Sequence, residues 1–110
     1  MKRIAMSAAA SALLRALLAR AAVARDRILL SEFRSVDWQS LTFMGERHEI
    51  ELRIAGPEAL QAYDRLADGL SDAEFDIPRQ IVADVALAGK PRVHEDGSLT
   101  LRIEALTIAE

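Results

Sequence analysis

Residues 47–54 alternate between charged and less polar side chains, and this alternation restricts the fold more than any other feature of the chain. The less polar positions are His48, Ile50, Leu52 and Ile54, with Arg or Glu between them. Successive side chains of a β-strand point to opposite faces of a sheet. A helix would distribute the same residues around its axis. The segment therefore predicts a strand with one face in a core and the other in water.

A second alternating run, residues 38–44, precedes this strand, and Gly45-Glu46 stands between the two runs. The dipeptide fits a two-residue type II′ turn, which favours glycine at its first position. The predicted hairpin then has a fixed register on each face. On the inner face it pairs Phe43 with His48, Leu41 with Ile50 and Gln39 with Leu52. On the outer face it pairs Met44 with Arg47, Thr42 with Glu49, Ser40 with Glu51 and Trp38 with Arg53.

The N-terminal segment, residues 7–25, has the composition of a helix. It contains no Gly or Pro and is rich in Ala, Leu and Arg, which are strong helix formers. Ser7 stands at the position of an N-cap. At 100° per residue one face collects mainly apolar side chains, namely Met6, Ala10, Leu13, Leu14, Leu17, Leu18, Ala21 and Ala24.

The remaining segments are predicted from shorter patterns. Residues 28–36 carry no decisive period and are interpreted as an edge strand or extended connector, with a helix extension left open. Gly56-Pro57 begins a second helix, whose apolar stripe is Leu60, Tyr63, Leu66, Ala67 and Leu70.

Residues 80–87 alternate, with Ile81, Ala83, Val85 and Leu87 inward. Gly89-Lys90-Pro91 predicts a kink or a bulge. Asp96-Gly97 predicts a hairpin turn before a last strand over residues 99–108.

The predicted order of elements is α-(β)-β-β-α-β-β. Two hairpins joined by a helix favour an α+β fold with a mostly antiparallel sheet of four to five strands and helices packed on one face. The 110 residues are expected to form a single domain, with a basic Ala/Leu-rich helix over residues 1–26 and an acidic body over residues 27–110.

Three stretches carry a resemblance to a known family. They are the run from Trp38 to His48, the run Ile81-Val82-Ala83-Asp84 and the closing run Glu104-Ala105-Leu106-Thr107-Ile108. Together they resemble a family of small uncharacterised bacterial proteins, over residues 38–108 at most. That family has no assigned activity, so the resemblance implies no functional residue.

Composition and charge exclude several classes of function. The chain has no cysteine, which excludes disulfides, Cys-ligated zinc, iron–sulfur clusters and thiol nucleophiles. Residues 1–25 carry five bases and no acid, a net +5, whereas residues 26–110 carry nine bases and 17 acids, a net −8. The acidic body argues against nucleic acid as a partner.

Arg15 and Arg20 interrupt the N-terminal apolar run and argue against a secretory signal or a membrane span. The abundance of Arg and Ala suggests a GC-rich bacterial genome, and we expect a cytoplasmic location.

The candidate site residues are few. His48 and His94 each precede a Glu and could together bind a divalent metal or move a proton. The favoured interpretation is that His48 packs against Phe43 while His94 is a solvated turn residue, so no metal site, cofactor or catalytic residue is predicted. Trp38 is placed on the outer face, either as a binding platform or covered by another segment. The ligand-binding candidates, between sheet and helices, are Trp38, His48, Arg53 and Tyr63.

The N-terminal helix carries most of the functional inference. It could pack on its own sheet, mediate self-association or lie on an anionic membrane, and Leu13, Leu14, Leu17 and Leu18 are the candidate interface residues. The favoured hypothesis is a non-enzymatic interaction or assembly module that forms a homodimer. The alternatives are a small ligand-binding domain or enzyme, and a membrane-surface protein that uses this helix.

Overall fold

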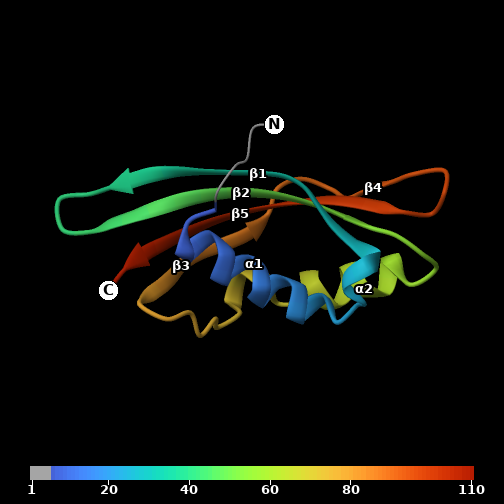
Figure 1. Ribbon diagram of the computed structural model, residues 1–110, viewed down its shortest axis with the longest axis horizontal. Coiled ribbons are helices and arrows are strands. Elements are labelled where there is room, and N and C mark those ends of the chain that lie inside the picture. The colour runs from blue at the N-terminus through green and yellow to red at the C-terminus, as the bar shows by residue number, and fades with distance from the viewer. Residues whose placement is uncertain (1–5) are drawn as a thin grey trace.

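The computed structural model describes residues 6–110 as an antiparallel sheet with two helices on one of its faces (Figure 1). The helices are α1 (Ala8–Ala21) and α2 (Ala59–Ala67), and the strands are β1 (Ile28–Gln39), β2 (Met44–Ile54), β3 (Gln80–Leu87), β4 (Arg92–Val93) and β5 (Leu99–Ala109). The strand order is β1-β2-β5-β3, and β4 also pairs with β5. The predicted α+β class is confirmed, as are the antiparallel sheet and the helices on one face.

The β1–β2 hairpin is longer than predicted, and its turn lies elsewhere. Residues 28–36 belong to β1, and the chain reverses over residues 40–43. The amide of Phe43 donates to Ser40 Oγ at 3.0 Å, and the amide of Ser40 donates to the carbonyl of Phe43 at 2.9 Å. Gly45 instead lies within β2, opposite Trp38. The predicted turn at Gly45-Glu46 and the register built on it, which paired Phe43 with His48, are therefore wrong.

The burial predicted for β2 is nevertheless confirmed. His48, Ile50, Leu52 and Ile54 are at most 2% exposed and face the helices. Their partners on β5 are Ala105, Ile103, Leu101 and Leu99, which are buried as well. Alternation fixes which face of a strand is buried whichever strand lies beside it, because the side-chain period is two residues.

Both helices contribute to this core and also stabilise each other's C-terminal end. Leu13 and Leu17 of α1 and Leu66 of α2 are fully buried. Arg20 of α1 donates to the Leu66 carbonyl at 2.9 Å and also to that of Asp68. Arg65 of α2 donates to the carbonyls of Ala21 at 2.9 Å and Ala22 at 3.3 Å. These carbonyls lack partners within their own helix, so each Arg satisfies acceptors that a helix terminus leaves open.

Outside the first hairpin, three positions predicted to face the core are wrong, namely Leu60, Ile81 and Ala83. Leu60 is 59% exposed, because the buried side of α2 is formed by Ala59, Ala62 and Leu66. In β3 the register against β5 shifts between Val82 and Asp84. This bulge turns Val82 and Val85 toward the core and leaves Ile81 51% exposed and Ala83 exposed. The kink or bulge predicted at residues 89–91 lies where the edge strand is interrupted, since β3 ends at Leu87, β4 begins at Arg92 and both pair with β5.

Gly45 provides a direct test of the observed register. A Cβ placed on Gly45 would collide with the backbone carbonyl of Thr107 on β5. We expect Gly45→Ala to lower the free energy of unfolding by about 1–3 kcal/mol, because backbone must move to make room. Met44→Ala is the matched control, since Met44 is the next residue and is 67% exposed, and it should change stability by less than about 0.5 kcal/mol. Urea titration measures both, and equal stabilities of the two variants would contradict the close approach.

Candidate functional site

His48 lies at the centre of a buried polar cluster that joins three strands. It is 1% exposed and points from β2 toward the helices. Its Nδ1 lies 2.7 Å from Ser35 Oγ on β1, and its Nε2 lies 2.8 Å from Thr107 Oγ1 on β5. A neutral imidazole donates from one nitrogen and accepts at the other, and hydroxyl groups can supply the complement to both. The ring therefore has a partner at each nitrogen without carrying charge.

The environment of His48 also determines its protonation. Burial lowers the pKa of His48 from its ordinary value of 6.5, while the nearby carboxylate of Glu46 acts in the opposite direction. Burial is the larger effect because the charged imidazolium loses its hydration. Glu46 itself accepts a hydrogen bond from Ser7 Oγ at 2.8 Å. The cluster thus holds a neutral histidine near the N-terminus of α1.

The two histidines do not meet. His48 lies opposite Ala105, whereas His94 Nε2 lies 2.7 Å from Thr100 Oγ1, five residues away along β5. The predicted packing of His48 against Phe43 is wrong, because Phe43 sits in the turn and is 53% exposed. Within residues 6–110 no group of three potential metal ligands is found.

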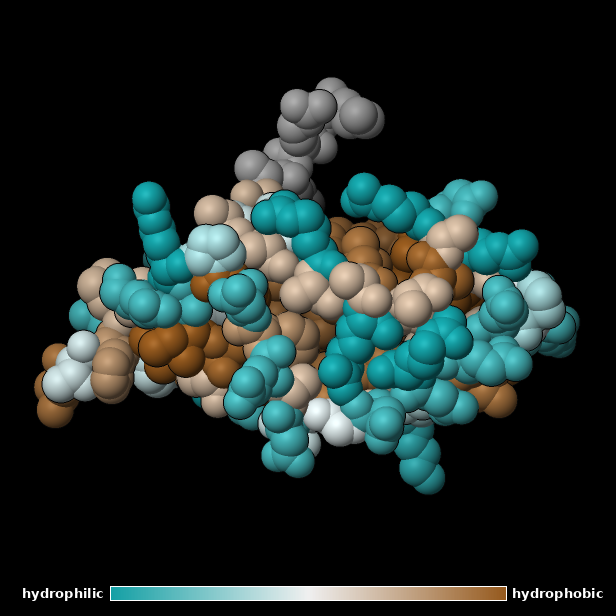
Figure 2. Space-filling model, turned by 90° about the horizontal axis from the view of Figure 1, so that it is seen from below, coloured by the Kyte–Doolittle hydropathy of each residue, from teal (hydrophilic) through white to brown (hydrophobic). Residues whose placement is uncertain are grey.

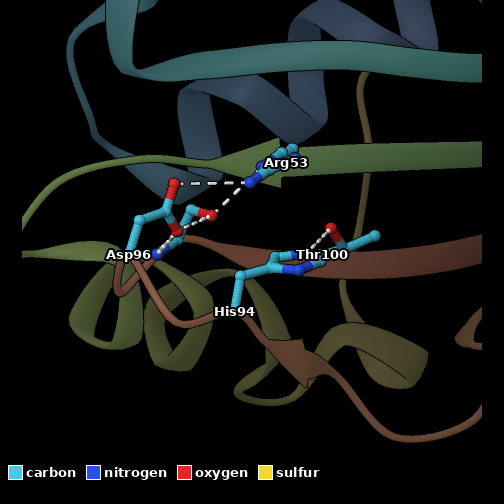
Figure 3. Close-up of polar contacts among 5 residues, drawn as sticks. Arg53, His94, Asp96 and Thr100 are labelled. Atoms are coloured by element: carbon cyan, nitrogen blue, oxygen red, sulfur yellow. Dashed lines mark hydrogen bonds and ion pairs between the residues drawn. The ribbon is translucent and has the colours of Figure 1, made fainter.

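Arg53 belongs to a polar cluster at the other end of the sheet (Figure 3). Its Nε donates to Ser98 Oγ at 3.1 Å, and its Nη2 lies 3.4 Å from a carboxylate oxygen of Asp96. Ser98 donates to Asp96 from its hydroxyl at 2.6 Å and from its amide at 2.9 Å. These hydrogen bonds lower the pKa of Asp96. The cluster ties the end of β2 to the turn between β4 and β5.

The structure does not bring the four ligand-binding candidates together. Trp38 pairs with Gly45 near the turn of the hairpin, and Arg53 pairs with Leu29 at its far end. Both lie on the open face of the sheet, whereas His48 points to the opposite face. Tyr63 is on α2 and packs against the core.

The four candidate interface leucines of α1 divide into two pairs. Leu13 and Leu17 are fully buried in the core of their own chain, while Leu14 and Leu18 are half-buried beside it. Leu18 lines a groove of about 350 Å³ whose other lining residues are Arg15, Ala19, Ala22, Val23, Arg25 and Ile28. Among the residues described, no helix has the length and apolar character needed to cross a membrane.

The open face of the sheet is charged and only shallowly hollowed. A depression of about 210 Å³ is lined by hairpin residues and by two residues of β5, namely Arg34, Val36, Arg47, His48, Glu49, Glu104 and Ala105. Arg34 and Glu49 lie 3.9 Å apart, and both side chains are exposed to water. Because basic and acidic residues alternate here, the face presents no single sign of charge to a ligand.

Exposed apolar side chains gather on the β1–β2 hairpin. Eight large hydrophobic residues in the described part of the chain are exposed, and five of them lie between residues 29 and 44. These five are Leu29 (60%), Val36 (41%), Leu41 (105%), Phe43 (53%) and Met44 (67%). Figure 2 shows hydrophobic residues on the projecting end at the far left of the molecule, where the hairpin turns. The apolar residues around Thr42 are the sequence signal for this exposed end, but the predicted register assigned Leu41 and Phe43 to the core.

Comparisons with known proteins find a distant structural similarity. No protein-family model matches the sequence, and no curated protein matches it. Both results are consistent with the resemblance to an uncharacterised family. Among solved structures the chain is similar to one described as "Virion of native gene transfer agent (GTA) particle", with 18% identity and a TM-score of 0.41. The match covers 74% of this chain and 65% of that one, and a similarity at this level does not extend to function.

The protonation of His48 predicts a specific pH dependence of stability. Below about pH 6.5 the unfolded chain binds a proton at this residue, whereas the folded chain resists it because its pKa is lowered. The free energy of unfolding should therefore fall as the pH drops from about 6.5 toward the folded pKa, by at most about 1.4 kcal/mol per pH unit from this group.

His48→Gln removes the titration and should reduce this slope. Urea titrations of both proteins between pH 8 and pH 5 measure it, and pH 8 serves as the reference because His48 is neutral there in both states. Identical slopes for the two proteins would show that His48 titrates alike in the folded and unfolded chains.

Proposed function

We propose that the protein is a non-enzymatic assembly module that forms a homodimer through its β1–β2 hairpin, in the cytoplasm of a bacterium. The observation that carries this proposal is the concentration of exposed apolar side chains on that hairpin. Leu41, Phe43 and Met44 lie together at its turn, and a group of exposed apolar side chains on a small protein is a mark of protein–protein contact sites. Single exposed residues elsewhere, such as Leu60 on α2 and Val93 on β4, have no such neighbours in sequence.

The shape of the hairpin supports the same function. The pairing of β2 with β5 begins at Gly45, opposite Ile108, so residues 39–44 extend beyond the neighbouring strand. Leu41 and Phe43 in this end contact water rather than the core. A projecting arm with an apolar tip can enter a partner's surface while the body of the domain keeps its own core intact.

The alternatives receive less support from the same residues. A small-molecule site would need convergent polar groups in an apolar pocket, whereas the candidates for such a site lie on different faces and both nitrogens of His48 are already hydrogen-bonded. A membrane-surface role would need α1 to leave the core, in which Leu13 and Leu17 are fully buried.

Removal of the apolar tip should weaken the dimer without unfolding the domain. We expect the wild-type protein to sediment as a dimer at micromolar concentration, and Leu41→Ser with Phe43→Ser to raise its dissociation constant at least about tenfold. Leu60→Ser is the matched control, because Leu60 is about as exposed as Phe43 but lies on α2, and it should leave the dimer unchanged. The stability of the protomer should change by less than about 0.5 kcal/mol in both cases. A wild-type chain that remains monomeric at millimolar concentration would refute the proposed function.

A further inference from the structure

Strand β1 is an edge strand of the sheet as far as residues 6–110 describe it. It pairs only with β2, and its other side has no partner strand among residues 6–110. A strand of 12 residues in this position presents a row of peptide groups to which another strand can bind. A bulge at Ser31 and the charges of Glu32 and Arg34 limit which strands can do so.

The charges on this edge are complementary to those of a second copy. In an antiparallel pair, directly opposed residues have their side chains on the same face of the sheet. A two-fold axis that relates two identical strands therefore passes next to a single residue, which then lies opposite its own copy. An axis at Glu32 or Arg34 sets like charges against each other. An axis at Phe33 sets Glu32 of each copy against the partner's Arg34, which gives two opposite-charge pairs.

The same axis also brings together the apolar side chains of the edge. Ser31 is the extra residue of the bulge and is skipped in the pairing. Beyond it, the pairing therefore places Ser35 opposite the partner's Leu30 and Val36 opposite the partner's Leu29. Val36 and Leu29 both lie on the open face and are 41% and 60% exposed. Each would cover the other across the interface, where apolar cross-strand pairs stabilise a sheet.

We propose that two copies of this chain join their β1 edges in antiparallel register, centred on Phe33, to form one continuous sheet. This inference rests on the proposed self-association and names the surface and register that produce it. The axis is perpendicular to the sheet, so the helices of both copies lie on the same side. The charge pairs and the bulge select this register over its neighbours.

The register also gives the apolar hairpin tip a place to bind. With Asp37 opposite the partner's Ile28, residues 39–43 of one copy continue past the start of β1 in the other. There lies the groove lined by Leu18, Val23 and Ile28. Leu41 and Phe43 would lie against these apolar residues, and Asp37 beside the basic residues Arg25 and Arg27, which complement its charge.

A charge-reversal series tests the pairing. Glu32→Arg should raise the dimer dissociation constant about tenfold, because it creates two like-charge pairs across the axis. Within its own chain Glu32 lies opposite Glu51, so an arginine here would replace a like-charge pair with an opposite-charge pair. The same substitution should therefore maintain or increase protomer stability. A weaker dimer with an equally stable protomer would show that the interface is affected and the fold is not. Arg34→Glu should weaken the dimer similarly, and the double reversal should return the dissociation constant to within about threefold of wild type. Arg102→Glu, an exposed arginine on β5, is the control and should have no effect.

Cysteine cross-linking tests the register itself, because the native chain contains no cysteine. Val36→Cys mixed with Leu29→Cys should form a covalent heterodimer on mild oxidation, whereas each variant alone should not cross-link at low concentration. A dimeric wild type with no rescue by the double reversal and no cross-link in the mixture would overturn the β1 pairing and leave the proposed self-association intact. Cross-linking by Val36→Cys alone would overturn the register, and a monomeric wild type would overturn both proposals.

Discussion

The pairing of β2 with β5 is the constraint on which the rest of the structure depends. Ile50 lies opposite Ile103 and Leu52 opposite Leu101, and all four side chains are buried against the helices. These two strands occupy the centre of the sheet, so their inner faces form the floor on which α1 and α2 pack (Figure 1). Burial of a large aliphatic side chain contributes about 1.5–3 kcal/mol. The edge strands and both helices attach to surfaces that this central pair provides.

The polar cluster of His48 adds specificity to this apolar core. Its ring has hydrogen-bond partners on both sides only when Ser35 of β1 and Thr107 of β5 are its neighbours. In a hairpin turning at Gly45, Phe43 would take the place of Ser35 and leave a buried nitrogen without a partner, at a cost of about 1–3 kcal/mol. A one-residue slip would move the ring to the other face altogether. Buried polar groups of this kind select one register among several that would bury similar apolar area.

This distinction explains what the sequence could and could not predict. Period-two alternation is a local property, and it predicted the buried face of β2, the last strand and the α+β class. Register is non-local, since it depends on which strands meet His48 and on the close approach of Gly45 to Thr107. Gly45 therefore suggested a turn where the structure requires a residue without a side chain. The bulge in β3 and the position of Leu60 on α2 were missed for the same reason, since each depends on a neighbouring element.

The same correction changes the functional interpretation of the chain. With the turn moved to residues 40–43, β1 gains its full length and is an edge strand with no second partner strand among residues 6–110. Leu41 and Phe43 move from the predicted core to the tip of an arm. The leucines of α1 that suggested an interface from sequence are then largely used within the chain, because Leu13 and Leu17 are fully buried. What remains for a partner is the half-buried side of α1 around Leu18, which adjoins the start of β1 through Ile28. The β1 edge, the projecting arm and the groove thus lie along one side of the molecule. Along that edge, Glu32 and Arg34 meet opposite charges of a second copy only when the two-fold axis passes next to Phe33.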